Sequence, residues 1–156
     1  MISNKANEKS KESKIEMSEN NTILFVEDTA DTRDLVEFGL RHEGLDVTTA
    51  QTAEEGAGIA RQREFALILL DVGLPDKDGL ELCREIRGFN KHTPILFFTA
   101  FADLLDHEEA KRAGAQGCLR KPEDTSRLAP IIKALIAKRT SETSTADKEN
   151  YAASPD

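Results

Sequence analysis

Asp71 is the residue whose type and position most clearly indicate chemistry, because this carboxylate directly follows an apolar run, residues 65–70. A short apolar run between turn residues is typical of a β-strand that is buried on both faces. Pro75 and Gly79 come after Asp71 and predict a turn before the next helical pattern. Open parallel α/β sheets bind their ligands beyond the carboxyl ends of the strands, which is where Asp71 is expected to lie.

Four other side chains with chemical potential also stand at the ends of predicted strands: Glu27, Asp28, Thr99 and Lys121. The carboxyl ends of parallel strands share one edge of a sheet, so we expect these four side chains to meet Asp71 there. Three neighbouring carboxylates repel one another strongly unless they are protonated or bind a cation. A small set of oxygen ligands favours Mg²⁺, whereas zinc would require histidine or cysteine.

This set of side chains is suited to holding a phosphoryl group. A metal ion in an open carboxylate site can bridge an incoming phosphoryl group, and Asp71 is the candidate nucleophile that would form an acyl phosphate. The Thr99 hydroxyl can donate to a phosphoryl oxygen, and Lys121 can supply a point positive charge. Each residue alone also has an ordinary role in a turn, a cap or a solvated surface. The hypothesis therefore depends on all five lying at one edge.

The elements that must position these residues alternate along the chain. Strands are predicted at 22–26, 45–50, 65–70, 94–98 and 116–120. Helices are predicted at 31–43, 52–63, 79–87, 103–113 and from about 126 onward. Strands separated by helical crossovers pair in parallel with right-handed connections. The predicted fold class is α/β: a flavodoxin-like doubly wound five-stranded parallel sheet in the order 2-1-3-4-5, with helices on both faces.

Both ends of the chain are poor in apolar residues. Residues 1–20 are mostly Lys, Glu, Ser and Asn, and residues 140–156 are mostly Ser, Thr, Ala and charged residues. Such segments bury too little apolar surface to offset the entropy of ordering. We therefore predict two disordered polar tails, 1–20 and 140–156, around a single domain at 21–139.

Composition excludes several classes of protein. The 156 residues carry a formal net charge of −8, which argues against nucleic acid as a main partner. No apolar run approaches the roughly 20 residues that a membrane-spanning helix needs, and the first 20 residues hold no apolar signal region. Cys83 and Cys118 fit no metal or redox spacing. These observations predict a cytoplasmic protein without membrane insertion.

Four stretches resemble, in order and spacing, the receiver domains of response regulators, and among them the stand-alone chemotaxis-type receivers. These stretches are residues 23–28, 69–83, 94–100 and 113–122, and the resemblance covers roughly residues 21–138. It implies that Asp71 is the phosphoacceptor, that Thr99 is the switch hydroxyl and that Lys121 pairs with the phosphoryl group. It also implies a cis bond between Lys121 and Pro122. The implied Mg²⁺ ligands are Glu27, Asp28, Asp71 and the backbone carbonyl of Gly73.

The resemblance also implies a function in two-component signalling. The chain would take a phosphoryl group from a phosphohistidine of a sensor histidine kinase or a histidine phosphotransfer protein, with Mg²⁺ as cofactor. It would then signal by contact with a downstream protein, or act as a phosphate relay or sink, as a monomer or weak dimer. It would assist only its own phosphorylation and dephosphorylation and would not be an enzyme in the metabolic sense. The alternative is a receiver-like interaction module that works without phosphate.

Several residues depart from the family pattern. Cys118 stands where receivers usually have Tyr or Phe, and Glu123 follows the Lys-Pro pair where Phe is frequent. Gly73 brings no side chain that could guide a hydrolytic water, and the apolar Phe101 follows Thr99 by two positions. We therefore expect slow self-dephosphorylation and an altered readout of activation.

Overall fold

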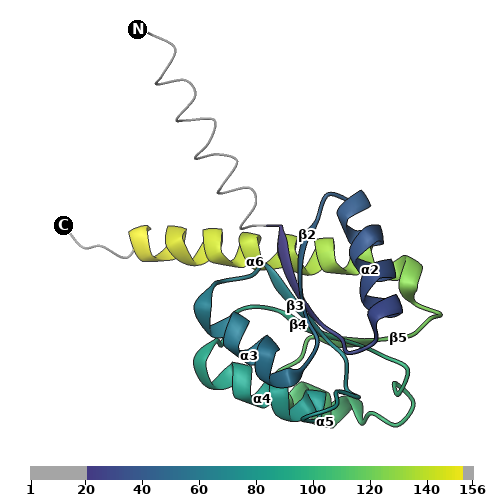
Figure 1. The fold of residues 1–156 in the computed structure, drawn as a ribbon. Helices are drawn as coiled ribbons and strands as arrows, with labels where there is room; N and C mark the ends of the chain where they lie inside the picture. Colours follow the sequence, from purple (N-terminus) through teal and green to yellow (C-terminus); the bar gives the residue numbers. More distant parts are fainter. Residues whose placement is uncertain (1–20, 153–156) are drawn as a thin grey trace, which may run out of the picture.

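Five short strands form one parallel sheet in the order β2-β1-β3-β4-β5 (Figure 1). Their bounds are β1 (Thr22–Val26), β2 (Asp46–Ala50), β3 (Leu67–Leu70), β4 (Ile95–Thr99) and β5 (Gly117–Arg120). This computed structural model describes residues 21–152, so the predicted tail at 1–20 lies outside the described residues. The predicted fold class and strand order are confirmed.

Within residues 21–152, five helices cover the two faces of the sheet (Figure 1). Their bounds are α2 (Ala30–His42), α3 (Ala53–Gln62), α4 (Gly79–Phe89), α5 (His107–Ala113) and α6 (Thr125–Ala152). One apolar cluster joins the sheet to α3, α4 and α5, and a second joins its other face to α2 and α6.

The central strands are apolar on both faces, as the continuous apolar runs predict. In β1, Leu24 and Val26 belong to the first cluster, whereas Ile23 and Phe25 belong to the second. All four are completely buried, and each such side chain contributes about 1.5–3 kcal/mol of transfer free energy. The sheet is therefore a rigid base from which the side chains at its carboxyl edge project.

Helix α5 begins later than the sequence predicts. We expected a helix over residues 103–113, but residues 101–105 form tight turns in which the Leu105 N–H donates to the Phe101 carbonyl at 3.1 Å. The carboxylate of Asp106 accepts from the Glu108 N–H at 2.9 Å and so caps the first turn. A capping carboxylate favours a helix start at the residue after it, which is His107.

Helix α6 ends later than the sequence predicts. The helix continues to Ala152, whereas we expected a disordered segment from residue 140, and residues 153–156 of that predicted tail lie outside the described residues. Leu128 and Ile132 anchor the start of α6 on the sheet. Residues 140–152 contain neither Gly nor Pro, so a helix that has nucleated on the packed residues before them can propagate through this stretch. The C-terminal half of α6 extends beyond the sheet (Figure 1).

No helix within residues 21–152 combines the length and the apolar character that crossing a bilayer requires.

Gly79 begins α4 directly against the backbone at the end of β3. A Cβ atom at position 79 would collide with the carbonyl oxygen of Asp71 and would lie 2.8 Å from the Cα of Val72. The N–H of Gly79 donates to the Val72 carbonyl at 2.9 Å, so the two segments cannot separate without losing this bond. Glycine is therefore required where α4 passes the loop that follows Asp71.

Replacing Gly79 by alanine should lower the free energy of unfolding by about 1–3 kcal/mol, because the backbone must shift to admit the methyl group. Gly58→Ala is the matched control, since position 58 is helical with open space around it. That change should stabilise the protein by up to about 1 kcal/mol. Urea unfolding of both variants checks this, and equal stabilities would contradict the close approach at Gly79.

Candidate functional site

Two carboxylates lie one residue beyond the central strands. Val26 of β1 pairs in register with Leu70 of β3, so Glu27 and Asp71 emerge at the same edge. The Glu27 N–H donates to the Ala50 carbonyl at 2.9 Å, and the Asp71 N–H donates to the Val26 carbonyl at 3.1 Å. These bonds extend the strand pairing by one step and hold both residues in place. Both are buried, with 1% of Glu27 and 6% of Asp71 exposed.

Asp28 completes a cluster of three carboxylates, and it is exposed to solvent. Glu27, Asp28 and Asp71 each offer an oxygen, and these oxygens all lie within 4.8 Å of one another. The predicted convergence of the three side chains is therefore found in the structure. An all-oxygen donor set with one side open to solvent fits a hard divalent cation such as Mg²⁺.

Lys121 supplies the positive charge of the cluster from the end of β5. Its Nζ lies 2.7 Å from Oε2 of Glu27 and 3.2 Å from Oδ2 of Asp71. The Lys121 N–H donates to the Thr99 carbonyl at 3.0 Å, which continues the pairing of β4 with β5. The bond between Lys121 and Pro122 is cis, which confirms that prediction.

The two buried carboxylates, Glu27 and Asp71, have pKa values that are shifted in opposite directions. Burial raises the pKa of Glu27 to about 7, with Asp71 adding to the rise and Lys121 opposing it. Burial also opposes ionisation of Asp71, but hydrogen bonding to Glu27 and the charge of Lys121 hold its pKa below the usual range. Asp71 is therefore the carboxylate that stays ionised, while Glu27 binds a proton readily when no cation is present.

Thr99 and Gly73 flank Asp71. The Thr99 side chain is fully buried, its Oγ1 accepts from the Phe101 N–H at 3.1 Å, and its hydroxyl helps to lower the pKa of Asp71. The Gly73 N–H donates to Oδ1 of Asp71 at 3.3 Å. The ring of Phe101 occupies the space of a side chain at position 73, since a Cβ on Gly73 would lie 2.8 Å from its Cε2. The structure thus places all the predicted site residues at one edge.

Sequence reasoning missed Arg33, which lies one turn into α2. Its Nη1 donates to the carbonyl of Glu27 at 2.9 Å and to that of Asp28 at 3.1 Å. The guanidinium therefore fixes the backbone that carries two of the three carboxylates. The only sequence signal was an arginine five positions after Asp28, where one helical turn can bring a side chain back to the strand end.

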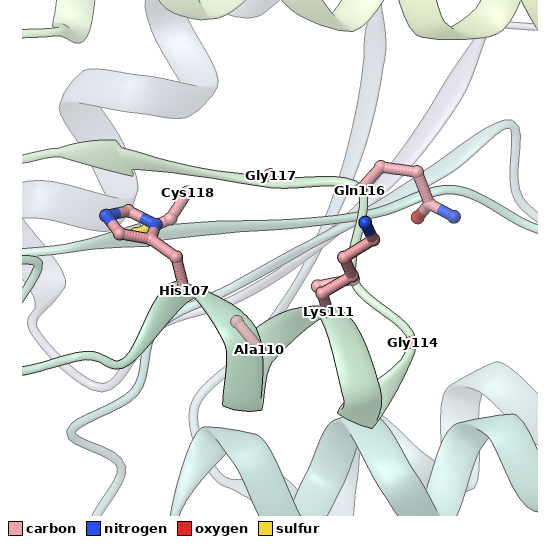
Figure 2. Close-up of a pocket in the computed structure, with 8 residues that line it drawn as sticks. His107, Ala110, Lys111, Gly114, Gln116, Gly117 and Cys118 are labelled. Atoms are coloured by element: carbon pink, nitrogen blue, oxygen red, sulfur yellow. The ribbon is translucent and has the colours of Figure 1, made fainter.

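Cys118 lies away from the acidic cluster, on the side of β5 that faces α5. A cavity of about 510 Å³ opens there, lined by His107, Ala110, Lys111, Gly114, Ala115, Gln116, Gly117 and Cys118. Figure 2 shows His107 and Lys111 projecting from α5 on one side, with Cys118 on the strand opposite. The small side chain of Cys118, where the resemblance leads to the expectation of an aromatic ring, helps to leave this space open.

Comparisons with known proteins agree on one family. The family model described as the response regulator receiver domain matches residues 23–133. The response regulator ArlR of Staphylococcus saprophyticus is 37% identical over 117 residues, which are 75% of this chain and 53% of ArlR. This chain thus spans about half the length of that relative.

Two solved structures share the fold. A CheY-like response regulator receiver domain from Methanospirillum hungatei superposes with a TM-score of 0.74 at 30% identity, covering 78% of this chain and 98% of that one. The response regulator TrrA of Thermotoga maritima, solved in complex with Mg²⁺ and BeF, has a TM-score of 0.69 at 28% identity, covering 74% and 98% of the two chains.

Replacing Lys121 by methionine should lower the free energy of unfolding by about 3 kcal/mol, because two buried carboxylates lose their counter-charge. The loss of stability should be greater at pH ~8 than at pH ~5. Glu27, with its pKa of about 7, is neutral at the lower pH and therefore has less need of the Lys121 charge there. Thermal unfolding at both pH values measures the difference.

Lys133→Met is the matched control for that experiment. Lys133 forms a comparable ion pair with Glu43 at 3.1 Å, but both side chains are about half exposed. Exposed pairs contribute at most about 1 kcal/mol. A loss at position 121 as small and as independent of pH as that at position 133 would contradict the coupling described here.

Proposed function

Because this chain belongs to the response regulator receiver domain family, we propose that it is a phosphoacceptor of a two-component phosphorelay, with Asp71 as the phosphorylated residue. The observation that carries the proposal is the meeting of Asp71 with Glu27, Asp28 and Lys121 at one sheet edge. A cluster with this charge pattern suits a cation and a phosphoryl group bound side by side.

Asp71 has the properties of a nucleophile for phosphoryl transfer. Its pKa lies below the usual range, so the carboxylate is ionised at neutral pH. In the proposed reaction the bond between phosphorus and a donor imidazole nitrogen breaks as a bond to an Asp71 oxygen forms, and the imidazole takes up a proton. Oδ1 accepts from the Gly73 N–H and Oδ2 from Lys121, which fixes the orientation of the carboxylate for in-line attack.

The proposed Mg²⁺ ligands are Glu27, Asp28, Asp71 and the backbone carbonyl of Gly73. When bound, Mg²⁺ would balance the negative charge that gathers on the carboxylates and the phosphoryl oxygens. TrrA, a relative of similar fold, was solved with Mg²⁺ and BeF, which supports this choice of cation. Binding would require Glu27 to lose its proton, so the raised pKa of Glu27 links cation affinity to pH.

Thr99 and Lys121 are the proposed partners of the phosphoryl oxygens. The Thr99 hydroxyl accepts one hydrogen bond from the Phe101 N–H, and its own proton, which already helps to lower the pKa of Asp71, could be donated to a phosphoryl oxygen instead. The ammonium group of Lys121 already lies 3.2 Å from Asp71, and phosphorylation would add negative charge beside it. Movement of these two groups toward the phosphoryl group is the proposed origin of the signal.

The proposed phosphodonor is a phosphohistidine on a sensor histidine kinase or a histidine phosphotransfer protein. The signal would pass to a downstream protein by contact, or the phosphoryl group would be relayed or lost by hydrolysis. The alternative function is a receiver-like interaction module that works without phosphate, for which the replacement of the usual aromatic residue by Cys118 is the supporting observation.

Incubation with a small phosphodonor and Mg²⁺ should add one phosphoryl group to the protein, detected by intact mass. Asp71→Asn should abolish the labelling, because the nucleophilic carboxylate is lost. Asp46→Asn is the control, since Asp46 is an exposed aspartate paired with Arg41 at the other end of the sheet. Labelling that persists in Asp71→Asn would contradict the assignment, and an unmutated protein that resists labelling would favour the phosphate-independent module.

The phosphorylated protein should lose its phosphoryl group slowly, because Phe101 and Gly73 offer no polar side chain to orient a water molecule. Phe101→Ala should accelerate hydrolysis several-fold by removing the ring that lies over Gly73. Leu104→Ala, in the same loop but 83% exposed, should leave the rate unchanged. The decay of the labelled mass gives both rates. A half-life of only seconds in the unmutated protein with Mg²⁺ would contradict the prediction.

A further inference from the structure

Asp76 lies in the connection between β3 and α4, but it binds the start of α3. Its Oδ1 accepts from the Ala53 N–H and its Oδ2 from the Glu54 N–H, both at 2.9 Å. The next N–H, that of Glu55, is capped by Thr52 Oγ1 at 3.1 Å. The first N–H groups of a helix have no partner within the helix, so this carboxylate from a distant loop completes the end of α3.

The segment that Asp76 holds also carries Gly73. The other backbone bonds of this segment are local: the Leu74 N–H and the Gly79 N–H donate to the carbonyl of Val72 at 3.1 and 2.9 Å, and the Gly73 N–H donates to Oδ1 of Asp71 at 3.3 Å. These bonds shape the turn and tie it to Asp71, but none of them reaches Glu27 or Asp28. The contact of Asp76 with α3 supplies a constraint between the loop and that side of the acidic site.

The start of α3 is itself fixed relative to Glu27. The Ala50 carbonyl at the end of β2, three residues before α3, accepts from the Glu27 N–H at 2.9 Å. Within α3, Gly56 lies against β1 so closely that a Cβ there would be 2.7 Å from Cγ2 of Val26. The helix start is therefore a stable reference point for the carboxylate side of the site.

We propose that Asp76 is a positioning residue of the cation site: acting through the N-terminus of α3, it holds the loop that carries Gly73 at a set distance from Glu27 and Asp28. This inference rests on the proposed function, because it matters only if a cation binds between these groups. A loop that is already ordered loses less conformational freedom when it contributes a ligand, so binding is tighter. Mutation of a residue that orients a metal ligand typically lowers the affinity for the metal by tenfold or more.

The test compares two full-length variants that each remove bonds from the same helix end. Asp76→Ala frees the loop, whereas Thr52→Ala removes the neighbouring cap and leaves the loop attached. Calorimetric titration of the unphosphorylated protein with Mg²⁺ should give a Kd about tenfold higher for Asp76→Ala. Thr52→Ala should keep the Kd of the unmutated protein, although both variants unfold at a lower temperature. Labelling of Asp76→Ala by a small phosphodonor should approach the normal rate at saturating Mg²⁺.

Two outcomes overturn the inference in distinguishable ways. If Asp76→Ala and Thr52→Ala both keep the normal Kd for Mg²⁺ while the unmutated protein is labelled, Asp76 only caps α3 and the proposed function stands. If the unmutated protein neither binds Mg²⁺ nor accepts label, the inference and the proposed function fail together. Should Asp76→Ala not fold, Asp76→Asn takes its place, because an amide group facing two N–H donors can accept only through its oxygen and should raise the Kd in the same direction.

Discussion

Mutual repulsion among Glu27, Asp28 and Asp71 is the constraint on which the rest of the structure depends. One ammonium group, that of Lys121, faces two of these carboxylates and cannot neutralise both. The conflict appears as the raised pKa of Glu27 beside an Asp71 that stays ionised. Three features keep these groups from moving apart. The strands are buried on both faces, Arg33 donates hydrogen bonds to the backbone of Glu27 and Asp28, and Asp76 binds the start of α3. The fold thus keeps an excess of negative charge at this edge of the sheet, where a cation can bind.

The convergence at this edge could be predicted because it follows from strand order alone. Glu27, Asp71, Thr99 and Lys121 each stand at the end of a predicted strand, and parallel pairing brings such ends together. The supporting contacts could not be predicted in the same way. Asp76 binds backbone N–H groups that lie 22 and 23 positions away, and no side-chain pattern marks such partners. The extension of α6 to Ala152 was missed because composition indicates only how little apolar surface the segment can bury, whereas a helix that is already nucleated gains one backbone hydrogen bond for each residue added.

The acidic cluster and the cavity beside Cys118 lie in different parts of the structure. The acidic cluster lies at the carboxyl edge of the central strands, whereas Cys118 lines a cavity between β5 and α5. Thr99 and Lys121, at the adjoining ends of β4 and β5, are the site residues nearest to that cavity along the chain. They are joined by a backbone hydrogen bond of 3.0 Å, so a shift of either residue would also displace the end of β5. With Cys118 in place of a ring, such a shift would change the shape of a hollow instead of moving an aromatic side chain.

The distance along the chain between Lys121 and its partners also bears on how the protein matures. Lys121 is 94 positions after Glu27 and 50 after Asp71, on the last strand to be synthesised. Until β5 docks, an assembling sheet carries two carboxylates at its edge with no lysine to offset them. Docking of the final strand therefore brings an electrostatic gain as well as apolar burial. Lys121, which is proposed to pair with the phosphoryl group, therefore also favours completion of the sheet. A nascent chain that lacks β5 has the acidic edge without this positive charge.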